Sequence, residues 1–296
     1  MTNDNLTMNR RQTLALLGGG ALLSTTGALL MTDKMAAAAT TQATLTQIRN
    51  ATLRVDYGGV RFLVDPMLAR VGAYAGFEGS AMSHLRNPLV PLPVPVEELT
   101  EVDAVLVTHL HSDHWDEVAI ATLNKALPIF SQNEEDAGEI RKAGFTDVRV
   151  LTEQMEFNGV LLSKTEGLHG TEATLNVLPL GHVCGIVFSH PDHKTLYVAG
   201  DTIWNEDVET ALKRHKPDVI VLNTGMATFI GLDPIIMGEK DVLSVHRASP
   251  NAMLVASHME AVNHCILSRA DLRAFAEKEG FSEKLLIPAD GEALRI

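Results

Sequence analysis

Residues 108–116 have the sequence Thr-His-Leu-His-Ser-Asp-His-Trp-Asp, which places three histidines and two aspartates within nine positions. The stretch directly follows residues 102–107, a short apolar run rich in valine that predicts a buried strand. The polar side chains therefore stand at the carboxyl end of a strand, where open α/β sheets form their ligand-binding crevices. This position makes residues 108–116 the first candidate for a functional site.

The spacing of these side chains favours metal binding. His109 and His111 are two residues apart, so in extended backbone their imidazoles point to the same side. Asp113 and His114 follow at the predicted start of a helix over residues 115–127 and can turn toward a second point nearby. Imidazole and carboxylate ligands suit zinc, iron or manganese. A set of plain surface histidines is the alternative, and the density of the H-x-H-x-D-H pattern after a buried strand disfavours it.

Three further candidates, His169, Asp201 and His258, each follow a predicted strand. A single histidine at a strand end is more often a surface or core residue with no ligand role. The joint placement of all three at the sheet edge that carries residues 108–116 favours one shared site. We expect two divalent cations, with zinc as the first expectation and manganese or iron as alternatives. One ion is assigned His109, His111 and His169, the other Asp113, His114 and His258, and Asp201 bridges them.

The H-x-H-x-D-H pattern resembles the signature motif of the metallo-β-lactamase fold superfamily. More narrowly, the chain resembles its ascorbate-6-phosphate-lactonase-like branch of metal-dependent hydrolases. That resemblance rests on Val64-Asp65-Pro66, Gly167-Leu168-His169-Gly170, Gly200-Asp201-Thr202 and Met237-Gly238-Glu239-Lys240-Asp241, which occur in that order. It covers nearly all of the chain after the N-terminal segment. The resemblance implies an α/β fold with a four-layer αββα sandwich and the same seven metal ligands.

The expected chemistry is hydrolysis of an ester-like bond by a hydroxide that two metal ions activate. Asp113 and Asp201 are the predicted catalytic residues, and Asp113 is expected to orient the hydroxide and to pass its proton to the leaving group. The resemblance favours a lactone or another cyclic ester as the substrate. The alternatives are a phosphodiesterase, a β-lactamase, and a non-catalytic metal-dependent binding protein of the same fold.

Three more residues are candidates for roles around the metal ions. Asp65 is expected to hold a ligand histidine by its second ring nitrogen, with a strand-end turn as the alternative. His182 and His264 are candidates for contact with the substrate, and plain loop histidines are the alternative for both. Residues 67–98, 170–182 and 226–236 are predicted loops that wall the site. Residues 67–98 are predicted to cover it as a flap, and a loop that only packs on the surface is the alternative.

The first 39 residues are predicted to be an export signal. They contain the pair Arg10 and Arg11, then the apolar residues 15–31, then a run of alanines that suits cleavage. The paired arginines are typical of a twin-arginine signal and predict a periplasmic or otherwise exported protein. An uncleaved membrane anchor is the alternative. Residues 40–296 are then expected to form one hydrolase domain without stable membrane association.

The composition of the chain indicates which kinds of binding partner to expect. The net charge is −13 and the sequence has no run rich in lysine and arginine, which disfavours a nucleic-acid partner. We expect a small-molecule substrate, and the sequence leaves a homo-oligomer open. The two cysteines, Cys184 and Cys265, either pair in an oxidising compartment or remain two buried small residues, which is the default expectation.

Overall fold

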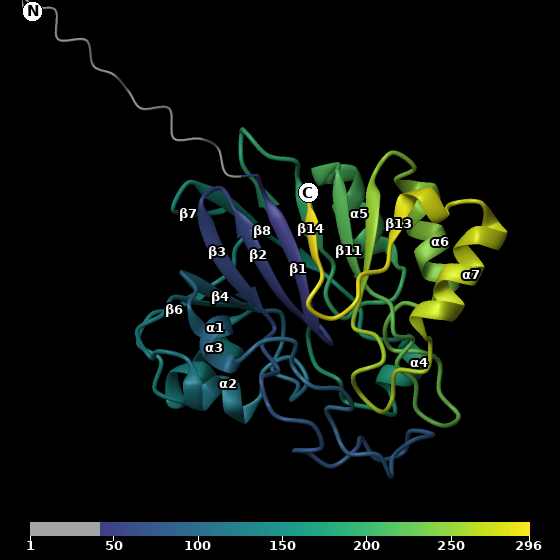
Figure 1. Cartoon of the computed structure of the whole chain (residues 1–296), viewed down its shortest axis with the longest axis horizontal. Helices are drawn as coiled ribbons and strands as arrows, with labels where there is room; N and C mark the ends of the chain where they lie inside the picture. The colour runs from purple at the N-terminus through teal and green to yellow at the C-terminus, as the bar shows by residue number, and fades with distance from the viewer. Residues whose placement is uncertain (1–41) are drawn as a thin grey trace, which may run out of the picture. The chain divides into compact units, whose positions relative to one another are not determined.

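The computed structural model describes residues 42–296, which form two mixed β-sheets packed face to face and flanked by helices (Figure 1). The first sheet consists, from edge to edge, of β14 (Ala293–Arg295), β1 (Thr44–Arg49), β2 (Thr52–Tyr57), β3 (Val60–Val64), β4 (Ala104–Val107), β5 (Ile129–Ser131) and β6 (Val148–Val150). The second consists of β13 (Leu285–Leu286), β12 (Met253–Ser257), β11 (Val219–Asn223), β10 (Leu196–Val198), β9 (Cys184–Ser189), β8 (Val160–Glu166) and β7 (Met155–Phe157). The predicted α/β sandwich is confirmed.

Helices cover the outer faces of the two sheets. The first sheet is covered by α1 (Val96–Thr100), α2 (Glu117–Thr122) and α3 (Glu134–Lys142), and the second by α5 (Glu206–His215), α6 (Glu239–Ala248) and α7 (Arg269–Glu279). The short α4 (Glu172–Leu175) and a 3-10 turn (Ser282–Lys284) complete the described range. No helix within residues 42–296 has the length and apolarity to cross a membrane. The predicted export signal, residues 1–39, lies outside the described residues.

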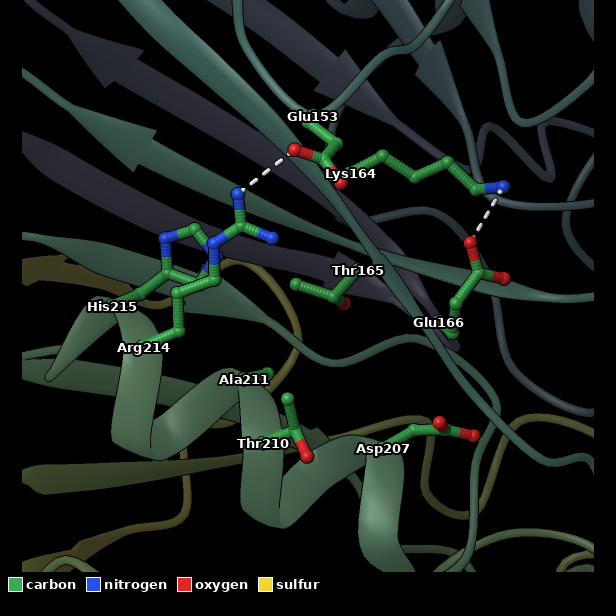
Figure 2. A pocket seen from close by; sticks show the side chains of 9 residues that line it. All are labelled: Glu153, Lys164, Thr165, Glu166, Asp207, Thr210, Ala211, Arg214 and His215. Atoms are coloured by element: carbon green, nitrogen blue, oxygen red, sulfur yellow. Dashed lines mark hydrogen bonds and ion pairs between the residues drawn. The ribbon is translucent and has the colours of Figure 1, made fainter.

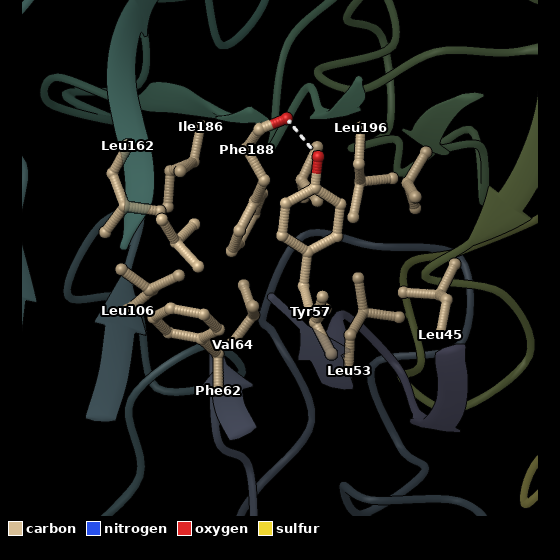
Figure 3. Packing of buried hydrophobic residues seen from close by; sticks show 14 of the residues in the cluster. Leu45, Leu53, Tyr57, Phe62, Val64, Leu106, Leu162, Ile186, Phe188 and Leu196 are labelled. Carbon is tan, nitrogen blue, oxygen red and sulfur yellow. Dashed lines mark hydrogen bonds between the residues drawn. The ribbon is translucent and has the colours of Figure 1, made fainter. Parts of the chain in front are cut away.

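Alternation along the strands divides the core into layers. In β4, Ala104 and Leu106 face the second sheet, whereas Val105 and Val107 face the helices. β11 alternates in the same way, so both faces of each sheet are apolar and buried. Figure 3 shows the layer between the sheets, where Phe62 and Phe188 meet from opposite sides with ring centroids 5.3 Å apart. Burial of this layer joins the two sheets into one body.

Two predicted elements differ from the structure. The alternating residues 45–57 predict one strand, but the chain reverses at Asn50, whose φ is 55°, and forms the antiparallel pair β1 and β2. The helix expected over residues 115–127 is only α2, six residues long. Asp116 delays its start because the carboxylate caps the helix by accepting from the Ala119 amide at 2.7 Å.

Short elements complete the two sheets and the loops. α1 and α4 fall within or next to the predicted loops 67–98 and 170–182. β14 pairs with β1 and adds the end of the chain to the first sheet. Cys184 and Cys265 are both buried and free, so the default expectation of two unpaired thiols is confirmed.

The topology brings distant loops to one edge of the sandwich. β3 to β6 are parallel in the first sheet, and β10 to β13 are parallel in the second. Parallel strands present their carboxyl ends at the same edge, so the loops after them lie side by side. The segments after β4, β10 and β12 therefore meet although they are far apart in sequence.

Arg49 anchors the loop that was predicted to be a flap, residues 67–98. The side chain is fully buried at the end of β1. Its Nη1 donates to the carbonyl of Val90 at 3.0 Å, and its Nη2 donates to the carbonyls of Met67 at 2.6 Å and Ala69 at 3.0 Å. Burial lowers the pKa of Arg49 to about 10. These bonds tie two parts of the loop to the first sheet.

We predict that Arg49→Met lowers the free energy of unfolding by about 3 kcal/mol, because three buried carbonyls lose their donor. Arg61→Met is the matched control. Arg61 is half exposed and pairs with Asp56 at 2.9 Å, so its loss should cost about 1 kcal/mol or less. Urea denaturation of the two variants and the wild type measures the difference. Equal stability of the two variants would contradict the anchoring role.

Candidate metal centre

Seven polar side chains meet at the carboxyl edge of the sandwich. His109, His111, Asp113 and His114 follow β4, His169 follows β8, Asp201 follows β10, and His258 follows β12. Three sets of these residues have ligand atoms within 4.8 Å of one another, namely His109, His111 and His169; His109, His114 and Asp201; and Asp113, His114 and His258. The first and last sets are the two predicted ligand triads. The structure thus brings together every residue that the sequence assigned to the metal ions.

Asp201 lies between the two triads. Its Oδ2 is 3.1 Å from His114 Nε2 and 3.7 Å from His258 Nε2 on one side. On the other side, the same oxygen is 3.6 Å from His169 Nε2 and 3.9 Å from His109 Nε2. A single carboxylate oxygen therefore faces both candidate ion positions, which is the arrangement expected of a bridging ligand.

Nitrogen atoms crowd together in each triad. His109 Nε2 lies 3.0 Å from His111 Nδ1, and His114 Nε2 lies 3.2 Å from His258 Nε2. His258 Nε2 is also 3.3 Å from Asp113 Oδ2. Imidazole nitrogens and carboxylate oxygens that converge from several sides are the donor set that zinc and related divalent cations take. The residues present fit a divalent metal centre.

Burial and the neighbouring carboxylates shift the pKa of His114 and of His258 in opposite directions. Burial favours the neutral form of His114, but Asp201, Asp65 and Asp113 outweigh burial and raise its pKa to about 10. The pKa of His258 is likewise raised against burial, mainly by Asp201. In return, His114 holds the pKa of Asp113 and of Asp201 well below the ordinary value, although burial alone would raise both.

The pKa of each of the other three ligand histidines is lowered, because burial outweighs the effect of the nearby carboxylates. Burial lowers the pKa of His169 to about 4 and also lowers the pKa of His109 and of His111. These imidazoles are neutral at pH 7, which is the protonation state that a metal ligand requires.

Hydrogen bonds behind the cluster fix the ligand rings. Asp65 accepts from His114 Nδ1 at 2.9 Å, as its predicted role requires. The same carboxylate accepts from the Thr108 amide at 2.8 Å and from the Thr108 hydroxyl at 2.7 Å. Asp65 therefore links the end of β3 to the start of the loop after β4, and it orients His114 toward Asp201.

Three other supporting contacts were not predicted. His169 Nδ1 donates to the carbonyl of Ile235 at 2.9 Å, and the Asn223 amide donates to Asp201 Oδ1 at 2.7 Å. The Cys265 thiol lies 3.4 Å from His258 Nδ1. Asn223 ends β11 at the same sheet edge, and this strand-end position is the feature of the sequence that could have identified its contact with Asp201. The other two contacts join loops whose sequences carry no marker of the pairing.

Backbone geometry at two positions allows this convergence. Gly200 has a φ of 71°, and a Cβ there would lie 2.4 Å from the carbonyl oxygen of Cys184. Only glycine fits at this point of close approach, which places Asp201 beside the neighbouring strand. His258 itself has a φ of 57°, and its amide donates to the carbonyl of Asn50 at 3.0 Å. The turn at Asn50, between β1 and β2, thus supports the metal-ligand candidate His258.

A cavity of about 210 Å³ opens beside the cluster. Its walls are Phe77, His111, Ser112, Asp113, His169, Leu180, Asp201, Phe229, Ile235 and His264. Each of the three predicted wall loops contributes at least one of these residues. His264 is buried, and burial lowers its pKa to about 4. His182 does not line this cavity; it is exposed and borders a neighbouring hollow with His109 and His111.

A separate hollow between β8 and α5 is shown in Figure 2. None of the seven candidate ligands lines it. Its long cationic side chains are already paired, Arg214 with Glu153 at 3.0 Å and Lys164 with Glu166 at 3.1 Å. The hollow therefore offers little uncompensated charge, and the chemistry of the protein concentrates at the metal centre.

Comparison with known proteins agrees with this geometry. Residues 60–259 match the family model described as the beta-lactamase superfamily domain. The chain belongs to this superfamily. The UPF0173 protein YddR of Bacillus subtilis is 48% identical over 251 residues, which cover 84% of this chain and 98% of that protein. A UPF0173 metal-dependent hydrolase of Nanoarchaeum equitans is 30% identical over 168 residues, 54% of this chain and 73% of its own.

Two solved structures are similar over most of this superfamily member. The isothiocyanate hydrolase from Delia radicum gut bacteria is 50% identical, with a TM-score of 0.82, and the match covers 86% of this chain and 99% of that one. A possible metal-dependent hydrolase from Veillonella parvula is 44% identical, with a TM-score of 0.85, over 86% of this chain and all of the other. The protein is accordingly a metal-dependent hydrolase with the metallo-β-lactamase fold.

We predict that Asp201→Ala lowers the metal content of the hydrolase toward one ion or none and abolishes turnover, because both candidate ion positions lose a shared ligand. Elemental analysis of the purified variant measures the first effect and a hydrolysis assay the second. Asp192→Ala, in the exposed turn after β9, is the control and should keep both properties. Full metal content in Asp201→Ala would remove this residue from the centre.

We also predict that zinc uptake at pH 7.5 releases protons, because the pKa of His114 and of His258 is raised in the metal-free cluster, whereas a cation binds only the neutral imidazole. The release should decline as the pH rises through about 10, where His114 is already neutral. Calorimetric titration in buffers of different ionisation enthalpy counts the protons. His258→Ala should release about one proton fewer. A net uptake of protons would contradict the assignment.

Proposed function

We propose that this hydrolase cleaves small neutral isothiocyanates, R–N=C=S, at a centre that holds two divalent cations. The observation that carries the proposal is the character of the cavity. Phe77, Leu180, Phe229 and Ile235 give it apolar walls, and no lysine or arginine occurs among the described residues that line it. Such a cavity favours an uncharged electrophile with an apolar substituent.

Similarity to the isothiocyanate hydrolase from Delia radicum gut bacteria supports the same substrate class. That hydrolase is 50% identical to this chain and is matched over 99% of its length. Phosphodiesters are disfavoured because anionic phosphate groups are usually bound by lysine or arginine, which the cavity walls lack. The second candidate is a neutral lactone or another cyclic ester. The order of the sequence motifs favours it, and the apolar walls accept it equally well.

The overall reaction is R–N=C=S + H₂O → R–NH₂ + COS. Water adds to the central carbon and one of its protons moves to nitrogen, which gives the adduct R–NH–C(=S)–OH. The hydroxyl proton of the adduct then also reaches nitrogen as the carbon–nitrogen bond breaks, so that R–NH₂ and COS leave. Divalent cations held by the seven clustered side chains, zinc by first expectation, would supply Lewis acidity and would lower the pKa of water at the site. Asp113 is ionised at neutral pH and lies at the cavity wall, where it accepts a hydrogen bond from the attacking water and orients it.

The apolar residues have a role of their own in this reaction. Phe77 comes from the loop after β3, and Phe229 comes from the loop after β11. Both rings line the cavity, where they contact the organic group of the substrate and exclude bulk water from the reacting carbon. Electrostatic interactions with the two aspartates are strengthened in such surroundings.

We predict that the full chain, loaded with zinc, hydrolyses benzyl and allyl isothiocyanate faster than it hydrolyses lactones or bis-p-nitrophenyl phosphate. Release of the amine measures turnover, and Asp201→Ala gives the background rate. Chelation should remove the activity and added metal should restore it. Turnover of a lactone without turnover of any isothiocyanate would replace the first candidate by the second. Inactivity of the metallated protein on every class would contradict a catalytic role for this site.

A further inference from the structure

His264 is held rigidly at the wall of the cavity. Its ring stands against Phe77, with centroids 4.5 Å apart, and near Phe229, with centroids 5.8 Å apart. Its carbonyl accepts from the amide of Thr228 at 3.0 Å. The side chain of the preceding residue, Asn263, accepts from the amide of Phe77 at 2.9 Å. Two of the cavity loops thus fix the position of this imidazole.

The two nitrogens of His264 have different surroundings. Nδ1 is sealed from solvent and has no hydrogen-bond partner among the described residues. The ring lines the cavity, and Nε2, unlike Nδ1, is not among the atoms that are sealed without a partner. Nε2 is accordingly assigned to the cavity side of the ring. An N–H buried without an acceptor is rarer in proteins than an unsatisfied acceptor atom. The proton of the neutral ring is accordingly assigned to Nε2, on the cavity side.

We propose that His264 is a catalytic residue whose Nε2–H donates a hydrogen bond to the heteroatom of the substrate that leaves the reacting carbon. This inference rests on the proposed function, in which that heteroatom is the isothiocyanate nitrogen. As water adds, a carbon–oxygen bond forms and the π electron pair of the C=N bond moves onto nitrogen. The donor from His264 stabilises that developing charge until a proton from the attacking water reaches the nitrogen.

The position of His264 suits this role. The metal ligands Asp113 and His169 line the same cavity, so a substrate held in it can face both the metal centre and the imidazole. None of the other histidines on the cavity wall is free to donate in this way, because His111 and His169 belong to the predicted ligand triad. His264 is thus the uncommitted imidazole among the described residues that line the cavity.

Three substitutions separate a hydrogen-bond donor from a packing group. His264→Phe keeps an aromatic ring between Phe77 and Phe229 but removes the donor. His264→Gln places an amide N–H near the position of Nε2, whereas His264→Asn places it near Nδ1, where no group accepts it. His84→Phe, on the exposed surface of residues 67–98, is the matched histidine control.

We expect His264→Phe to keep its metal content and to lose about 100-fold in kcat, with a smaller change in KM, because the bond strengthens in the transition state. His264→Gln should stay within about tenfold of the wild type, and His264→Asn should resemble His264→Phe. The loss should be larger for alkyl isothiocyanates than for electron-poor aryl ones, whose ring already spreads the charge on nitrogen. A purely structural residue would not produce this dependence on the leaving group.

Distinct outcomes separate this inference from the proposed function. If the wild type hydrolyses isothiocyanates and metal-loaded His264→Phe keeps kcat within about threefold, the donor role is overturned and the substrate class stands. If the wild type hydrolyses only lactones, the proposed substrate fails, and the same variants on the lactone decide whether His264 serves the leaving oxygen. If His264→Phe fails to fold, equal rates for His264→Gln and His264→Asn overturn the donor role.

Discussion

The structure depends on the convergence of Asp201 with four imidazoles whose Nε2 atoms lie 3.1 to 3.9 Å from one carboxylate oxygen. Buried ionisable groups are costly unless they are paired or coordinate a metal ion. The carboxylates offset this cost in part by raising the pKa of His114 and of His258. Divalent cations that replace protons on these imidazoles satisfy the same charges, so metal binding is also a contribution to folding stability.

Both sheets are needed to build this convergence. The first sheet supplies the loop after β4, and the second supplies the loops after β8, β10 and β12. Asp65 holds the ring of His114 from the first sheet, and Asn223 holds Asp201 from the second. The apolar layer between the sheets positions these two supports relative to each other. Substitutions in that layer would therefore change the spacing of the two sheets and, through it, the distances between the metal ligands.

The cavity and the metal centre make different contributions to function. The donor set is general for the superfamily and supports hydrolysis of many bonds. The walls come from Phe77, Leu180, Phe229 and Ile235, which lie in loops, and they determine which substrate approaches the centre. Residues 67–98 are hydrogen-bonded to Arg49 and to Asn263, so this loop forms a wall of the cavity that is tied to the rest of the fold. A rigid wall suits a small neutral substrate, which needs orientation more than charge compensation.

The sequence alone determined the features that depend on the local pattern of residues. The H-x-H-x-D-H spacing predicts paired ligands because extended backbone repeats every two residues, and the strand ends predict His169, Asp201 and His258 because parallel strands share one edge. Only the tertiary structure decided the turn at Asn50, the contact of Cys265 with His258, and the placement of His264 in the cavity but His182 outside it. These features depend on which loops pack together, and that packing follows from the whole core rather than from any short stretch of residues.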